Sequence, residues 1–113
     1  MPAFEWPAML DLFGAERLAE LLGVSVASLR RYAKDERPTP DVVAARLHLL
    51  ARIVAELRGA YSEIRVRRWF ERSRTALRGR APDDLLTGAW DPDGADAERV
   101  LALARSLTAS PAT

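Results

Sequence analysis

Arginine is concentrated in one short part of the sequence. Seven arginines lie between residues 65 and 80, against one acidic residue, Glu71. On a helix, Arg65, Arg68 and Arg72 would share one side. Guanidinium groups bind the oxygens of phosphates and carboxylates, so this segment is either a nucleic-acid surface or a surface for a protein partner. We favour the protein surface.

Acidic residues follow directly after the arginines. Residues 81 to 98 hold six acidic side chains and no basic one: Asp83, Asp84, Asp91, Asp93, Asp96 and Glu98. The two blocks either pair within the fold or orient a charged partner. Trp69 and Phe70 lie among the arginines, and they are either core residues or part of an interface hot spot.

A second group of cations lies in a segment typical of a helix-turn-helix. Residues 15–22 predict one helix, Gly23 a left-handed turn, and Ser25 the N-cap of a second helix over residues 26–34. Ala19 is small enough for the two helices to cross closely. The alternative is a structural hairpin whose three cations are solvated. If the pair binds DNA, the contacts would come from the exposed side of the second helix: Ser25, Ala27, Ser28, Arg30, Arg31 and Lys34.

Catalytic and metal chemistry have little support. The chain has no cysteine and one histidine, His48, so a thiol nucleophile, a disulfide and a thiolate zinc site are excluded. Asp83 and Asp84 stand at the start of a predicted helix, where acids interact favourably with the helix dipole. We therefore expect a protein that is not an enzyme and that needs no metal or cofactor. The net charge of +1 is low for a protein that depends mainly on phosphate contacts.

The sequence gives no sign of a membrane segment. No apolar run approaches the roughly 18 residues of a membrane span. The first ten residues, MPAFEWPAML, have no basic region before an apolar stretch, so we expect no signal peptide. The expected location is the cytoplasm.

The periodic segments all predict helices, so the expected fold is all-α and compact. The longest helix is predicted over residues 41–57, with Pro40 opening it and Thr39 as its cap. Its apolar stripe is Val43, Leu47, Leu50, Val54 and Leu57, widened by Val42, Leu49 and Ile53. Further helices are predicted over 62–71 (with Ile64, Trp69 and Phe70 as its large apolar residues), 82–86 and 96–107. We divide the chain into residues 1–60, which contain the helix-turn-helix, and residues 61–113.

The run RRWFERSRTALRGRAPDDLL, residues 67–86, resembles the toxin-binding domain of the Xre/MbcA/ParS antitoxin family. That family has a helix containing tryptophan, an Ala-Leu-x-Gly segment, a proline followed by a Leu-Leu pair, and a final helix. The matching positions here are Trp69, residues 76–79, Pro82, residues 85–86 and residues 100–107. The sequence is most similar to the MbcA branch.

The resemblance implies an antitoxin of a type II toxin–antitoxin system. Its partner would be a RES-domain toxin that destroys NAD, and the chain would act by blocking the toxin's active site. The family also implies a hetero-oligomer with the toxin, contacts between antitoxin copies, and repression of the operon through the helix-turn-helix. The alternative is a transcriptional regulator of the Xre type, whose C-terminal half only dimerises.

Residues 61–113 would make the contact with the toxin. A pocket for NAD holds an anionic pyrophosphate, so it offers cations that Asp91, Asp93 and Asp96 would face. The arginines would pair with acids at the rim of the pocket, and Trp90 and Leu107 would exclude water. The predicted toxin-binding residues are Arg72, Arg74, Arg78, Arg80, Trp90, Asp91, Asp93, Arg105 and Leu107.

Overall fold

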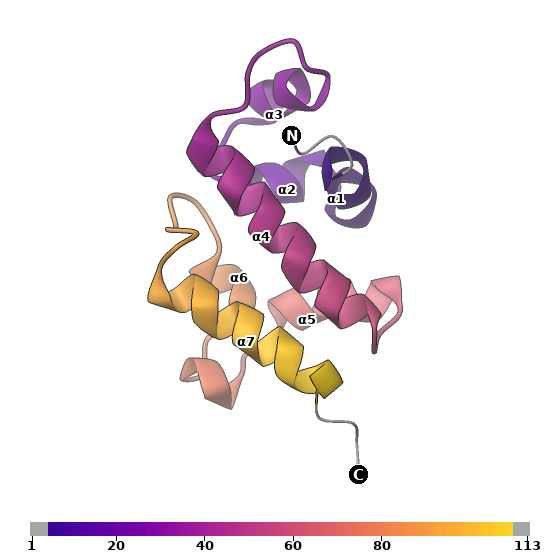
Figure 1. Ribbon diagram of the computed structural model, residues 1–113, viewed down its shortest axis with the longest axis vertical. Coiled ribbons are helices and arrows are strands. Elements are labelled where there is room, and N and C mark those ends of the chain that lie inside the picture. Colours follow the sequence, from indigo (N-terminus) through magenta and orange to yellow (C-terminus); the bar gives the residue numbers. More distant parts are fainter. Residues whose placement is uncertain (1–4, 110–113) are drawn as a thin grey trace.

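Helices account for all the regular structure that a computed structural model describes, over residues 5–109. The all-α fold class is confirmed (Figure 1). In this part of the chain the only β-type pairing is one isolated antiparallel bridge, between Arg74 and Arg80. The elements are α1 (Glu5–Phe13), α2 (Ala15–Leu22), α3 (Val26–Ala33), α4 (Asp41–Arg58), α5 (Glu63–Glu71), a short 3-10 helix η1 (Thr75–Leu77), α6 (Pro82–Leu85) and α7 (Ala95–Ala109).

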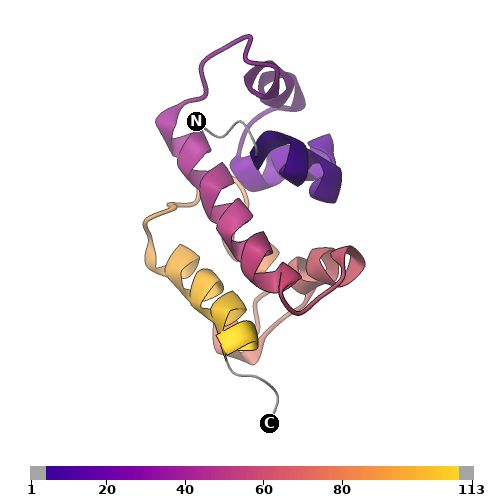
Figure 2. The same ribbon diagram turned by 45° about the vertical axis from the view of Figure 1, so that its right-hand side comes forward.

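Helix α4 runs through the middle of the molecule, with α1 and α2 on one side and α7 on another (Figures 1 and 2). Packing on more than one side explains its wide apolar face. All five residues of the predicted stripe are buried, and so are Leu49 and Ile53. The prediction for Val42 is wrong, because its side chain is 46% exposed. It lies on the solvent side of the turn that buries Val43.

Helix α1 was not expected from the sequence. It presents Trp6, Met9 and Leu12 to the core, at the three-residue spacing of one helix face. Pro7 stands in its first turn, where backbone N–H groups have no intrahelical acceptor, so the helix tolerates the missing donor. Burial of this face against the core, with α4 as a neighbour, stabilises the helix.

The first helix pair begins and ends close to the predicted residues. Gly23 follows α2 in the left-handed region, with φ 70°, and the N–H of Val24 donates to the carbonyl of Ala19 at 3.0 Å. The hydroxyl of Ser25 caps α3 by accepting from the N–H of Ser28 at 3.1 Å. Leu29, on the inner side of α3, is fully buried.

The end of α2 is held by residues from elsewhere in the chain. The carbonyl of Glu20 accepts from the N–H of Gly23 at 3.2 Å and also from the N–H of Gly88 at 3.0 Å. The next two carbonyls, which have no such local donor, accept from Trp90 Nε1 (Leu21 O, 2.6 Å) and from Arg46 Nη1 (Leu22 O, 3.0 Å). Arg46 Nε also donates to the carbonyl of Trp90 at 2.8 Å. We call this network the α2 cap; it ties residues 1–60 to residues 61–113, which also share one hydrophobic core.

Several helix starts differ in detail from the prediction. Pro40, instead of Thr39, is the N-cap of α4, and Ser62 precedes α5 without a side-chain capping bond. Helix α7 begins at Ala95, one residue before the predicted Asp96. Ile64 is 54% exposed and so lies outside the core. Trp69 and Phe70 are buried, in agreement with the interpretation that they are core residues.

Candidate functional site

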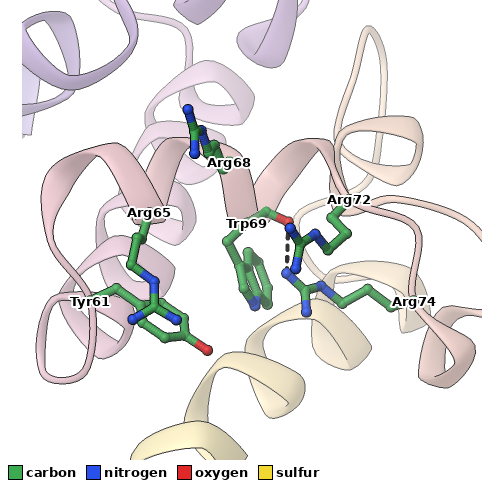
Figure 3. A pocket seen from close by; sticks show the side chains of 6 residues that line it. All are labelled: Tyr61, Arg65, Arg68, Trp69, Arg72 and Arg74. Atoms are coloured by element: carbon green, nitrogen blue, oxygen red, sulfur yellow. Dashed lines mark hydrogen bonds between the residues drawn. The ribbon is translucent and has the colours of Figure 1, made fainter.

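An arginine-lined hollow of about 170 Å³ lies on the side of α5. We call it the arginine cleft, and it is lined by Tyr61, Arg65, Arg68, Trp69, Arg72 and Arg74. Figure 3 shows Arg65 stacked on Tyr61 to one side of Trp69, with Arg72 and Arg74 on the other side. Helical spacing brings most of this set together, because Arg65, Arg68 and Arg72 recur every three or four residues.

Aromatic rings hold two of the guanidinium groups in place. The guanidinium carbon of Arg65 lies 4.4 Å from the centre of the Tyr61 ring, and that of Arg74 lies 4.8 Å from the Trp69 ring. Arg74 Nη2 also donates to the Trp69 carbonyl at 3.2 Å. Such contacts reduce the conformational freedom that an arginine would lose on binding an anion.

The positive charge in the cleft is not balanced by the protein's own acids. In the described part of the chain, none of the seven arginines between residues 65 and 80 forms an ion pair with an acidic side chain. Burial lowers the pKa of the Arg74 guanidinium, Tyr61 opposes this, and the neighbouring charge of Arg72 lowers it further. The basic and acidic blocks therefore do not pair with each other through the arginines of residues 65–80.

Two buried donors in the cleft lack acceptors. Trp69 Nε1 and Arg74 Nε are shielded from solvent and have no hydrogen-bond partner among residues 5–109. Because both atoms are shielded from solvent, neither is open to a group that enters the hollow. The groups that can meet an oxyanion there are the exposed guanidinium groups of Arg65, Arg68 and Arg72.

The other predicted toxin-binding arginines lie outside this cleft. Arg78 and Arg80 are exposed and line a separate hollow together with Asp96 and Arg99. Arg105 is exposed on α7 and lies 3.9 Å from Glu56 of α4. Of the predicted set, only Arg72 and Arg74 line the arginine cleft.

The acidic residues lie on the loop before α7. Asp91 and Asp93 are exposed, and Asp91 Oδ1 accepts from the N–H of Asp93 at 2.9 Å. Asp96 lies 3.5 Å from Arg99 within α7. Leu107, near the other end of α7, is half-buried against the core. The predicted residues thus occupy several places around the C-terminal half, not one continuous patch.

Trp90 must be removed from the set of contact residues. Only 8% of its surface is exposed, and both its ring nitrogen and its carbonyl belong to the α2 cap. The sequence presents Trp90 among aspartates and glycines, which made it look like an exposed anchor. Its actual role is structural, because it satisfies a carbonyl at the end of α2.

The cleft contains four residues that the predicted site left out: Tyr61, Arg65, Arg68 and Trp69. A signal was present for three of them. Arg68 and Trp69 follow Arg65 by three and four residues, so these three share a helical side. Tyr61 lies before α5, so helical spacing does not place it. The spacing of aromatic and arginine residues was therefore a better guide than arginine number alone.

The predicted DNA-binding residues lie at the other end of the molecule. Ser25, Ala27, Arg30, Arg31 and Lys34 are exposed, and Ser28 is half-buried. Figure 1 shows α3 and α5 at opposite ends of α4, whose 18 residues span about 27 Å. The arginine cleft and the surface of α3 are therefore separate cationic surfaces. Asp35 and Glu36 follow α3 and are exposed, which weakens the positive field there.

Residues 5–109 contain neither a cluster of metal-binding side chains nor a membrane-spanning helix. No three or more His, Cys, Asp or Glu side chains are grouped so that they would hold a metal ion. None of the helices found there has the length and hydropathy needed to cross a membrane.

Comparison with known proteins adds no relative. No family model, no curated protein and no solved structure matches this chain.

Proposed function

We propose that this chain is an antitoxin that binds a RES-domain, NAD-degrading toxin and neutralises it by blocking its active site. The observation that carries the proposal is the unneutralised arginine surface of the C-terminal half. Seven arginines lie between residues 65 and 80, and none of them forms an ion pair with an acid of the described chain. Such a surface is suited to an acidic partner.

The composition of this surface favours a protein partner. Arginine and tyrosine are enriched at the centres of protein interfaces, and accessible side chains of both kinds line the arginine cleft. Trp69, at 3% exposure, supports them from the core. Ile64 is 54% exposed one helical turn before Arg68, which adds an apolar contact. The resemblance of residues 67–86 to a toxin-binding domain supports a RES-domain toxin as that partner.

The acidic loop offers a second contact for the same partner. Asp91 and Asp93 are exposed and carry no ion pair among residues 5–109. They are free to face the cations that a pocket for the NAD pyrophosphate requires. In this proposal the arginines bind the rim of the toxin pocket, and the loop approaches the cationic groups within it.

The test is co-expression of the chain with a RES-domain protein encoded beside it. We expect the RES-domain protein alone to deplete cellular NAD, and the pair to purify as a complex of defined native mass. A chain that purifies alone, beside a partner that does not affect NAD, would contradict the proposal and leave the regulator as the better function.

DNA binding by α3 is a second candidate function. The observation that favours it is the α2–α3 pair, in which a left-handed Gly23 and the Ser25 cap present Arg30, Arg31 and Lys34 to solvent. Its separation from the arginine cleft would allow one molecule to bind operator DNA and a protein at the same time. Repression of its own operon would follow from such binding.

The double variant Arg30→Gln/Arg31→Gln tests this second function. If both arginines contact phosphates, a plot of log affinity against log salt for the chain's own promoter DNA should lose about 2 units of slope. Affinity should fall at every salt concentration. Arg52→Gln, which removes an exposed charge from α4, should leave the slope unchanged. Equal slopes for wild type and the double variant would exclude α3 as the DNA-binding helix.

A further inference from the structure

The arginine cleft gathers positive charge that no acid of the described chain neutralises. None of its guanidinium groups has a carboxylate partner among residues 5–109. Arg72 and Arg74 lie on the same side of Trp69 (Figure 3), so their like charges repel until an anion binds. A bound oxyanion would relieve this repulsion.

The cleft is large enough for an acidic side chain. A hollow of about 170 Å³ has room for a carboxylate with its neighbouring methylene groups, because about 10–15 Å³ on the same measure is enough for one water. The planar fork of a guanidinium matches a carboxylate through two parallel hydrogen bonds. Stacking on Tyr61 holds the guanidinium of Arg65 in one orientation, as a fork requires.

The surroundings of the cleft favour a peptide over a nucleic acid. A nucleic-acid backbone needs a row of cations along its path. The next arginines, Arg78 and Arg80, line a separate hollow that also contains Asp96. Ile64, in contrast, is exposed beside Arg68 and would contact an apolar side chain next to an acidic one.

We propose that the arginine cleft binds an acidic side chain of the partner protein, in a segment where that acid has an apolar neighbour that packs on Ile64. The carboxylate lies over Trp69, between Arg65 on one side and Arg72 and Arg74 on the other. This inference rests on the proposed function only for the identity of the partner. The chemistry of the cleft is independent of it.

The first test uses probes in place of the partner. The indole N–H resonances of the three tryptophans are followed by NMR, with that of Trp69 assigned from a Trp69→Phe variant. An acetylated peptide of alternating glutamate and leucine should shift the Trp69 resonance. It should not shift those of Trp6 and Trp90, which are buried away from the cleft. Arg65→Gln/Arg72→Gln, which changes two exposed side chains, should abolish the shift.

Two further probes separate the sources of the oxyanion. Inorganic phosphate and a short DNA duplex are added at the same ionic strength as the peptide. A Trp69 shift with DNA or phosphate but not with the peptide would overturn the proposal in favour of a phosphate site. No shift with any probe would overturn it altogether.

The second test uses the RES-domain partner. Arg65→Gln/Arg72→Gln should weaken the complex about thirtyfold or more, whereas the matched pair Arg30→Gln/Arg31→Gln, at the other end of the molecule, should not. If the double variant binds with unchanged affinity, the proposal that the cleft binds an acidic side chain is contradicted, but the antitoxin function is not. Failure of the wild type to form any complex contradicts the antitoxin function, and the peptide experiment then decides on the cleft.

Discussion

Replacement of Gly23 by alanine is expected to lower the free energy of unfolding by about 3 kcal/mol or more. A Cβ at this position would lie 2.2 Å from the carbonyl oxygen of Gly88 and 2.7 Å from its carbon. These are backbone atoms, so the loop that carries Trp90 would have to move. The left-handed φ of 70° adds a cost for any residue with a Cβ.

The loss should exceed the cost of the backbone conformation alone. Gly79→Ala is the matched control, because Gly79 also has a positive φ, 81°, but a Cβ there would meet no atom within 4 Å. We expect about 1–2 kcal/mol for the control, measured by urea unfolding. Equal losses for the two variants would show that Gly23 and the loop of Gly88 are not in close contact.

Arg46→Met is expected to destabilise the protein by about 2–3 kcal/mol. Arg46 is the one buried charged residue among those described, at 8% exposure, and it donates to the carbonyls of Leu22 and Trp90. Methionine preserves the apolar stem but leaves both carbonyls without these donors. Removing the charge also removes the cost of burying it. We therefore expect a smaller loss of stability than the sum of the costs of two carbonyls without donors.

Two comparisons isolate the α2 cap as the cause. Arg52→Met, at an exposed position of the same helix, should change the free energy of unfolding by no more than about 0.5 kcal/mol. Arg46→Lys should recover only part of the loss, since an ammonium group lacks the fork that spans two acceptors. A stable Arg46→Met variant would mean that the two carbonyls find water or other donors.

Helical periodicity made most of the fold predictable. The apolar stripe of α4 and the turn from Gly23 to Ser25 were predictable because residues close in the sequence determine a buried helix face and a capped turn. Helix α1 was not predicted, although Trp6, Met9 and Leu12 recur at the three-residue spacing of one helix face. The α2 cap was missed because it joins residues that lie 24 to 69 positions apart in the sequence.

The sequence predicted the chemistry of the candidate site better than the residues that line it. The arginine block indicated an anionic partner, and Arg72 and Arg74 do line the cleft. Trp90 was assigned wrongly, because nothing near it in the sequence reveals the carbonyl of Leu21 as its acceptor. Trp69 was left out although its spacing from Arg65 placed it on the same side of a helix. Tyr61 lies before α5, so its stacking on Arg65 became evident only in three dimensions.

The most direct measurement is a titration of NAD consumption by the purified RES-domain partner with increasing amounts of this chain. The account predicts a linear fall to zero that ends sharply at a simple ratio of the two proteins, because a tight complex blocks the active site. Arg65→Gln/Arg72→Gln should turn the sharp end point into a gradual curve. NAD consumption that continues unchanged in a large excess of the chain would contradict the antitoxin function.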